Sequence, residues 1–189
     1  MTTTLTPTEE VEHQLQAHPL TQSLRSDSTL LETRYYRYVP ESLRPQMFTL
    51  GSLVGPGKLP VPPLAFYRAE GECFYLILYI GSSVAGYPGM VHGGMLATLM
   101  DEGLAGCASA TLPIHVAVTL HLSVDYLKPA PTEAFYVLKA KASKLEGRSV
   151  WVEGQLEILE NDRCAGEVLV KGHGEYMQPP STRSFYSIL

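Results

Sequence analysis

The hydrophobic positions of this chain follow two periods, one typical of helices and one typical of strands. Apolar residues between positions 93 and 110 recur at helical spacing, and small residues fill the opposite side. A helix that is apolar on nearly all sides, and therefore buried, is predicted there. Residues 115–126 instead alternate, which predicts a strand with one face in the core. The face expected to be buried carries Val116, Val118, Leu120, Leu122, Val124 and Tyr126, and the other carries His115, Thr119 and His121.

Four further segments of strand length predict the rest of a sheet. Residues 73–80 form a continuous apolar run, and residues 134–143, 149–159 and 164–174 follow it, separated by turn signals such as Glu146-Gly147-Arg148. The short connections favour antiparallel neighbours. One buried helix with antiparallel strands after it predicts an α+β fold in which the sheet wraps around the helix.

The part of the chain ahead of these strands is expected to form an extension. Residues 1–46 are polar and favour helix, with Thr8 as a candidate cap and Pro19 as a candidate end. Residues 47–63 are rich in Gly and Pro, which excludes long regular structure, although their apolar side chains predict packing on the main domain. We therefore expect an N-terminal extension at 1–46, one domain at 47–177 and a C-terminal tail at 178–189.

Composition narrows the class of protein. The 189 residues are 45% hydrophobic and 17% charged, which is typical of one globular domain. The net charge of −5 argues against nucleic acid as a partner, because phosphate binding needs a basic surface. The longest apolar run is far shorter than the ~20 residues of a membrane-spanning helix, so no membrane span is expected.

The cysteines and the first residues predict the cellular location. The three cysteines are scattered without a C-x-x-C pair, which argues against a disulfide framework or zinc site and favours a reducing compartment. Residues 1–12 hold no Lys or Arg, unlike secretory or mitochondrial leaders. A cytoplasmic location is expected, since Ser187-Ile188-Leu189 only faintly matches a peroxisomal signal whose middle residue is basic.

The candidate chemistry begins with Asp101, an acidic residue inside the predicted buried helix. An ionised carboxylate in apolar surroundings is costly unless it is paired or hydrogen-bonded. No cation lies one helical turn away, where the chain has Ala97, Thr98, Leu104 and Ala105. A poorly compensated carboxylate is a candidate base or nucleophile. An ordinary acidic residue at a solvent-facing edge remains the alternative, and it is the interpretation that suits Glu102.

The start of the same helix is a second candidate. Val91-His92-Gly93-Gly94 places two glycines where free backbone amides and the positive end of the helix dipole face outward. Without Cβ atoms a ligand can approach this backbone closely, which suits a developing oxyanion, although glycine pairs are also ordinary packing devices.

The spacing of the two candidates bears on the oligomeric state. Gly93 and Asp101 are eight residues apart, roughly 12 Å along a helix axis, so one protomer cannot bring both to one carbonyl group. Two antiparallel helices across a two-fold axis can do so. If both residues are catalytic, the protein is at least a dimer.

Two motifs in the chain resemble the hotdog-fold acyl-CoA thioesterases. The first is His92-Gly93-Gly94 followed by Asp101, the pattern H-G-G-x(6)-D, and the second is the downstream strand that ends in Tyr126-Leu127-Lys128-Pro129. The resemblance covers residues 73–177 and is nearest to the phenylacetate-pathway type and the animal thioesterase-superfamily members. It implies a hotdog fold, with an antiparallel sheet wrapped around one long central helix, here with an N-terminal helical extension.

The resemblance also implies roles for single residues. Asp101 matches the residue that attacks the thioester or activates water, and Gly93 matches the glycine whose amide polarises the carbonyl. His92 matches a histidine that helps to shape the site, and Thr119 matches a hydroxyl residue that positions the water or the carboxylate. Many relatives carry Asn or Gln six residues before the histidine, where this chain has Gly86, so one polar contact is expected to be missing.

A second set of residues is expected to bind coenzyme A or the acyl group. Basic residues around the 145–148 turn would complement phosphate charge, although a solvated turn is the alternative. His115 and His121, which share a face in the predicted alternation with Thr119, lack metal-site spacing, so neither metal nor cofactor is expected. The predicted binding residues are Gly94, Lys128, Lys144, Arg148 and Ser149.

The predicted function is hydrolysis of an acyl-CoA thioester to a carboxylic acid and coenzyme A, within fatty acid metabolism. The expected assembly is a homodimer or a dimer of dimers, that is, a homotetramer. Two alternatives stay open. The same site would serve an acyl chain carried by an acyl-carrier protein, because both thiols end in a phosphopantetheine arm. The other alternative is a non-catalytic module that binds acyl thioesters, because Gly86 stands where many relatives have a polar residue.

Overall fold

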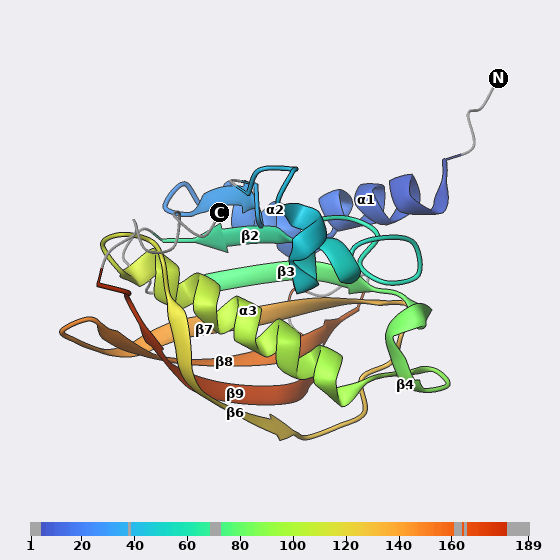
Figure 1. Cartoon of the computed structure of the whole chain (residues 1–189). Helices are drawn as coiled ribbons and strands as arrows, with labels where there is room; N and C mark the ends of the chain where they lie inside the picture. The colour runs from blue at the N-terminus through green and yellow to red at the C-terminus, as the bar shows by residue number, and fades with distance from the viewer. Residues whose placement is uncertain (1–4, 38, 69–72, 161–163, 165, 181–189) are drawn as a thin grey trace.

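One antiparallel sheet with a long helix packed across it forms the centre of the molecule (Figure 1). The computed structural model describes residues 5–37, 39–68, 73–160, 164 and 166–180. Within these residues, the seven strands follow the order β1-β2-β3-β7-β8-β9-β6, which confirms the predicted α+β fold. The strands are β1 (Leu31–Arg34), β2 (Leu64–Tyr67), β3 (Phe74–Ile80), β6 (Val118–Tyr126), β7 (Ala134–Glu146), β8 (Ser149–Leu159) and β9 (Val168–Met177).

The central helix, α3 (Gly93–Thr111), is the buried helix that the hydrophobic pattern predicts. It lies close to the sheet because some facing positions are glycine. A Cβ at Gly103 would come within 2.4 Å of Leu138 on β7, and one at Gly172 within 2.8 Å of Met100. Buried apolar side chains fill this interface, among them Leu96, Leu99, Met100, Leu104 and Cys107.

Two N-terminal helices, α1 (Pro7–Ala17) and α2 (Pro19–Ser26), build a second core with strands of the sheet. The N-cap of α1 is Thr6, in a capping box with Glu9, rather than the predicted Thr8. Pro7 is favoured at the first helical position, which explains the earlier start. α1 ends at Ala17, before Pro19 as predicted, and Pro19 opens α2 because proline suits the first helical position there too. Buried members of this second core include Leu15, Leu20, Leu24, Phe66, Ile77 and Val137.

The connections from β1 to β2 and from β3 to α3 contain only short elements, as their Gly and Pro content predicts. β1 pairs with β2, so the sheet includes a strand from the predicted 1–46 extension; the domain boundaries themselves stay predictions. Between β1 and β2 lie η1 (Arg44–Gln46) and η2 (Phe48–Ser52). Between β3 and α3 lie η3 (Ser82–Val84) and the two-stranded β4 (Ala85–Tyr87) and β5 (Met90–Val91).

Strand β6 departs from the predicted alternation because it contains a bulge. The pairing register with β9 shifts between Thr119 and His121, so one residue is left unpaired. Thr119 therefore lies on the side that faces α3, together with Leu122, and not with His121 as predicted. Leu120, expected in the core, is 51% exposed. The strand also begins three residues later than predicted, since His115 has a left-handed backbone with φ of 53°.

The other predicted strands lie near their predicted positions. β8 matches residues 149–159, β7 runs three residues further than predicted, and β9 spans 168–177 rather than 164–174. The three cysteines are free. In the described part of the chain, no helix combines the length and the apolar character that crossing a membrane requires.

Candidate active site

Asp101 lies in the middle of α3, and its carboxylate faces two strands of the sheet. The Thr119 hydroxyl, on β6, donates to Asp101 Oδ1 at 2.9 Å, and the Tyr176 hydroxyl, on β9, lies 3.3 Å from the same oxygen. Burial raises the pKa of Tyr176 and the nearby Asp101 charge raises it further, so the phenol remains a proton donor. Among the described residues, no lysine or arginine forms an ion pair with Asp101. A carboxylate held only by hydroxyls is suited to act as a base or nucleophile.

Tyr176 is the member of this group that sequence reasoning missed. The predicted strand stopped at residue 174, and no spacing motif connects Tyr176 with Asp101, 75 residues earlier. The β6–β9 register explains the contact, because Thr119 pairs directly with Tyr176 and directly opposed side chains share one face of a sheet.

The next residue of the helix, Glu102, faces the N-terminal segment rather than solvent. The Tyr36 and Thr49 side chains hydrogen-bond to its carboxylate, and the Tyr35 hydroxyl donates to its backbone carbonyl at 2.6 Å. Burial raises the pKa of Glu102, and these hydroxyl contacts partly oppose that effect. The expectation of a solvent-facing Glu102 is wrong, because residues between β1 and β2 fold over this side of α3.

Tyr36 reaches Glu102 from a strained backbone conformation. Its φ is 67°, in the left-handed region that bulky residues rarely adopt. It lies in a turn closed by a hydrogen bond from the Arg37 amide to the Arg34 carbonyl at 3.1 Å. Glycine would adopt this conformation without strain. Strain of this kind is a reason to look for function nearby.

At the N-terminal end of α3, His92, Gly93 and Gly94 form the predicted helix start. The Gly94 amide donates to His92 Nδ1 at 2.9 Å, so the ring caps the helix and this amide is already bonded. The Tyr126 hydroxyl donates to the Gly93 carbonyl at 2.9 Å. Helix geometry provides no intrahelical acceptor for an amide at the first position, so the Gly93 amide is the candidate oxyanion donor here.

Gly86 packs directly beside His92. A Cβ at Gly86 would lie 3.1 Å from His92 Cα and 3.2 Å from its ring Cδ2, closer than side chains normally pack. The polar residue that the resemblance leads one to expect at this position would therefore press on His92 unless the ring shifted.

The structure of one protomer keeps Asp101 and Gly93 on a single helix, about two turns apart. Eight residues at 1.5 Å each correspond to roughly 12 Å along the axis. The two groups are therefore not brought together within one chain, and the two-fold arrangement stays a prediction.

The residues predicted to bind coenzyme A are divided between the two ends of the sheet. Arg148 and Ser149 lie at the β7–β8 hairpin, where Ser149 pairs with Met177, the residue that also pairs with Val118 at the start of β6. Lys128 follows the other end of β6, roughly 27 Å away at 3.4 Å per residue. One protomer cannot place both sets on the same phosphate group.

The lysines of this set already have partners on the surface. Lys128 pairs with Glu167, and Lys144 pairs with Glu146 while its Nζ lies 4.6 Å from the centre of the Trp151 ring. Exposed pairs of this kind are weak, so a phosphate can replace the carboxylate partner.

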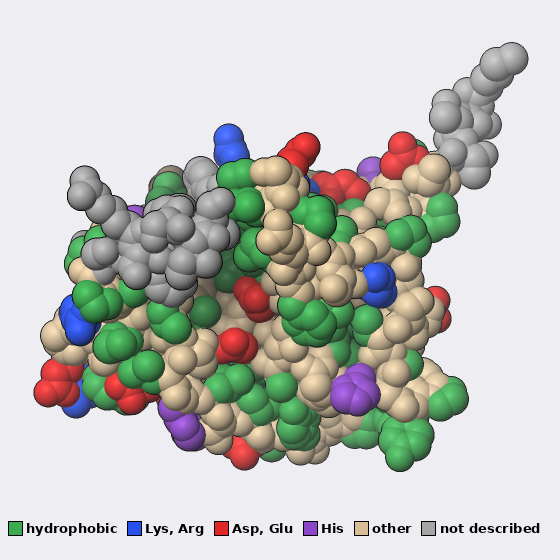
Figure 2. All heavy atoms as spheres, in the orientation of Figure 1, with side chains coloured by type: hydrophobic (Ala, Val, Ile, Leu, Met, Phe, Trp, Pro, Cys, Tyr) green, Lys and Arg blue, Asp and Glu red, His purple; other side chains and the backbone are tan. Residues whose placement is uncertain are grey.

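Figure 2 shows the face of the molecule on which α3 lies. Acidic side chains lie in a recess near the middle of this face, hydrophobic side chains surround the recess, and lysine and arginine side chains lie nearer its margins. A substrate with an anionic headgroup would therefore meet cations at the margins of this face rather than beside the central carboxylates.

Cys107 and the histidines of β6 and β9 take no part in this site. Cys107 is buried in α3, and burial raises the pKa of its thiol to about 12, so it stays protonated at neutral pH. His121 and His173 are exposed neighbours with ring centres 6.2 Å apart.

Comparison with known proteins shows the family. Residues 88–165, which include the helix start, Asp101 and Thr119, match the thioesterase superfamily. The fold is similar to that of a crystallised thioesterase superfamily protein (TM-score 0.53, 24% identity, 61% of this chain and 56% of that chain). It is also similar to that of the Escherichia coli PaaI protein from the phenylacetic acid degradation operon (TM-score 0.52, 14% identity, 59% and 75%). Residues 88–165 therefore belong to the thioesterase superfamily, and the chain has its hotdog fold.

Three curated relatives illustrate the range of similarity. UPF0644 protein PB2B4.06 of Schizosaccharomyces pombe is 33% identical over 81% of this chain and 58% of its own length. An uncharacterized mitochondrial protein of Candida albicans is 29% identical over 69% of this chain and 59% of its own length. Acyl-coenzyme A thioesterase THEM4 of Rattus norvegicus is 32% identical over 46% of this chain and 36% of its own length. The chain thus spans little more than half of the first two relatives.

The expected cytoplasmic location is contradicted by these comparisons. The Candida albicans relative, similar over 69% of this chain, is described as mitochondrial. The prediction rested on free thiols and on the composition of twelve residues. These properties describe the chemistry of the chain rather than the targeting event that decides its compartment.

Proposed function

We propose that this protein hydrolyses an acyl-CoA thioester to a carboxylic acid and free coenzyme A. The observation that carries the proposal is the Asp101 carboxylate, held within an apolar helix by the hydroxyls of Thr119 and Tyr176. The two hydroxyls orient this carboxylate as a base or nucleophile requires, and among the described residues no lysine or arginine forms an ion pair with it. That the rat relative is named an acyl-coenzyme A thioesterase supports the choice of substrate class.

In the proposed reaction, Asp101 acts at the thioester carbonyl. Its oxygen either bonds to the acyl carbon, forming an anhydride that water then cleaves, or takes the proton of a water molecule that attacks this carbon. In both routes the carbonyl oxygen gains negative charge, the carbon–sulfur bond breaks, and the departing thiolate takes up a proton. Thr119 and Tyr176 hold the carboxylate in one orientation, which lowers the entropic cost of the attack.

The second protomer is proposed to supply the oxyanion donor, the Gly93 amide beside His92. In the described structure β6 is an edge strand, and Leu120 and Tyr126 on it are more than half exposed. Open edges of this kind are normally covered in natural proteins. Pairing two copies there would give a homodimer, and a dimer of dimers would follow from a further contact.

Coenzyme A is proposed to bind across the same dimer. Lys144, Arg148 and Ser149 form the basic hairpin that suits its phosphates, and Gly94 and Lys128 lie at the other end of the sheet. These two sets can meet one coenzyme A molecule only if different protomers supply them.

Release of free thiol from a panel of acyl-CoA esters tests the proposal. The parent protein should release coenzyme A, and Asp101→Asn should remove at least about 99.9% of the rate, the upper range for loss of a catalytic base. Asp125→Asn, the same change at an exposed carboxylate on β6, is the matched control and should retain the parent rate. Near-normal turnover by Asp101→Asn would contradict the assignment.

Mixed dimers test the proposed sharing of the site. Gly93→Pro removes the amide donor while keeping a residue that is favoured at the first helical position. Gly93→Pro and Asp101→Asn should each be nearly inactive alone. Mixing the two variants should restore turnover, because a heterodimer contains one intact site. Absence of recovery in a verified heterodimer would overturn the proposed sharing of the site between protomers.

Two other functions are distinguished by the same measurements. Turnover of an acyl-carrier-protein thioester, with none of the acyl-CoA esters, would establish the carrier-bound substrate. Thermal stabilisation by acyl-CoA without thiol release would establish a binding module. The binding module is worth testing because Gly86, which packs tightly against His92, supplies no polar side chain where the resemblance leads one to expect one.

A further inference from the structure

A cavity of about 480 Å³ lies in the segment that connects β1 to β2. Its size is that of pockets that bind small molecules. The residues that form it lie between positions 34 and 63, outside the 88–165 stretch that matches the thioesterase superfamily. The cavity is therefore a feature of this chain's own N-terminal part.

The lining of the cavity is apolar and positively charged. Leu59 and Val61 are buried in its wall, Val54 is 39% exposed, and Pro62 and Pro63 add further apolar surface. The described lining residues include no acidic side chain but three of the chain's eight arginines, Arg34, Arg37 and Arg44. In a protein with a net charge of −5, this concentration of arginine is unusual and complements an anion.

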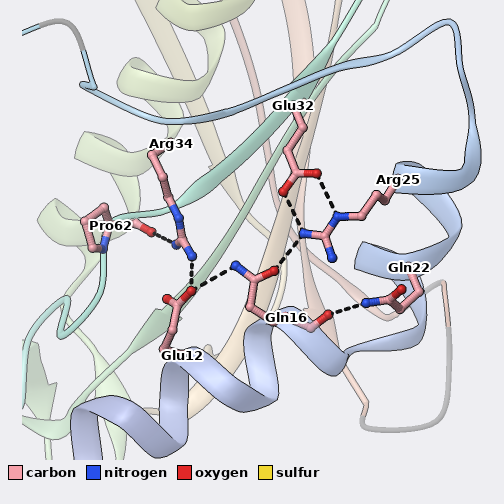
Figure 3. A network of polar contacts seen from close by, with 7 residues as sticks. All are labelled: Glu12, Gln16, Gln22, Arg25, Glu32, Arg34 and Pro62. Carbon is pink, nitrogen blue, oxygen red and sulfur yellow. Dashed lines mark hydrogen bonds and ion pairs between the residues drawn. The ribbon is translucent and has the colours of Figure 1, made fainter.

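The arginines differ in how strongly the protein already uses them. Arg34 is held by the Glu12 carboxylate and by the Pro62 carbonyl, within the network that ties α1 to β1 (Figure 3). Arg44 Nε donates to the Val39 carbonyl at 3.1 Å, while its Nη1 lies 3.9 Å from Glu41, a carboxylate that is 91% exposed. Such a surface pair is weak, so a ligand carboxylate can take the place of Glu41.

The cavity adjoins the part of α3 that carries Asp101 through residues that also contact Glu102. Tyr36 and Thr49 line the cavity and also hydrogen-bond to Glu102, the residue that follows Asp101. The strained φ of Tyr36 is thus located where the cavity wall meets α3. Tyr35 also lines the cavity, and its hydroxyl donates to the Glu102 backbone carbonyl at 2.6 Å, so the cavity wall contacts the helical turn that carries Asp101.

We infer that this cavity binds the acyl group of the thioester, and that its arginines bind a carboxylate at the far end of that group. The inference rests on the proposed thioester hydrolysis and names its preferred substrates as ω-carboxyacyl thioesters. The apolar wall suits methylene groups, and the guanidinium groups at the exposed side suit a terminal carboxylate. The coenzyme A phosphates fit this cavity less well, because the pantetheine arm separates them from the thioester.

Two six-carbon CoA esters, one plain and one with an ω-carboxylate, test the inference. The parent should have a higher kcat/KM for the ω-carboxyacyl ester, and Arg44→Leu should lower the ratio of the two kcat/KM values about tenfold, the effect of losing one charge-assisted contact. Arg37→Leu is a second variant, in case Arg44→Leu does not fold. Lys141→Leu, an exposed cation paired with Glu153, is the control and should leave the ratio unchanged.

The outcomes separate this inference from the proposed function. Turnover of both esters with a ratio that neither arginine variant changes would overturn the cavity assignment and leave thioester hydrolysis standing. If no ester is hydrolysed, the proposed function fails. Thermal stabilisation of the parent by the free six-carbon dicarboxylate then decides whether the cavity binds a carboxylate. Stabilisation that Arg44→Leu abolishes would support a carboxylate site in the cavity, and no stabilisation would overturn it. Stabilisation by the free dicarboxylate, with no preference among hydrolysed esters, would overturn the acyl-group assignment.

Discussion

Asp101 and Glu102 are neighbours on α3, yet they face two different regions of the molecule. Asp101 faces the sheet, where hydroxyls from β6 and β9 hold its carboxylate. Glu102 faces the segment between β1 and β2, where Tyr36 and Thr49 hold it and burial raises its pKa. The two carboxylates are chemically similar, so their surroundings decide their roles. The sheet side supplies the proposed chemistry, and the N-terminal side anchors a segment that closes over the helix.

The most direct test of this difference between the two carboxylates is to remove each charge with the smallest change of shape. Asp101→Asn should lower kcat at least about a thousandfold, whereas Glu102→Gln should lower it by less than about tenfold. The measurement is thiol release from the best acyl-CoA ester, with circular dichroism to verify folding. Equal losses in the two variants would show that the carboxylates act as one unit.

The hydroxyls on the sheet side should matter less than the carboxylate they hold. Thr119→Val and Tyr176→Phe each remove one hydroxyl that contacts the Asp101 carboxylate and should lower kcat about tenfold, corresponding to roughly 1.4 kcal/mol of transition-state stabilisation. Thr119→Ser keeps the hydroxyl and should retain most of the rate. If Thr119→Ser were as slow as Thr119→Val, packing rather than the hydrogen bond would be the cause.

On the N-terminal side, the main effect should be on stability. Tyr36→Phe removes a hydroxyl from the half-buried Glu102 carboxylate while the strained backbone remains, and should cost about 1–3 kcal/mol of unfolding free energy. Urea unfolding measures this loss. Tyr87→Phe is the matched control. Because Tyr87 is 73% exposed, this variant should unfold at the same urea concentration as the parent.

The smallest expected effect is the pH dependence that Glu102 adds. Burial raises the pKa of this carboxyl above its ordinary value of 4.5. Its contribution to stability is therefore complete below about pH 4.5 and is lost as the pH rises through the pKa of the folded state. The melting temperature of Glu102→Gln should rise relative to the parent between about pH 4 and pH 8. A constant difference, or a difference of opposite slope, would show that Glu102 is not destabilised by burial.

Much of the fold could be predicted, because its elements have strong local patterns. The central helix and the strand at 149–159 match their predicted bounds closely, since hydrophobic period and turn residues lie within each segment. The face of Thr119 could not be predicted, because a bulge reverses the alternation and depends on pairing with β9. The cap at Thr6 was missed by two residues for a local reason, the preference of proline for the first helical turn.

The sequence by itself determined the thioesterase family, the buried helix and Asp101 as a candidate, because motif spacing and helical period are properties of contiguous residues. Only the tertiary structure decided that Tyr176 joins Asp101, that Glu102 is covered by Tyr36 and Thr49, and that three arginines share one cavity. These contacts join residues from distant parts of the chain, and no local period encodes them. They depend on strand register and on how the N-terminal segment packs, which are set by the free energy of the whole fold.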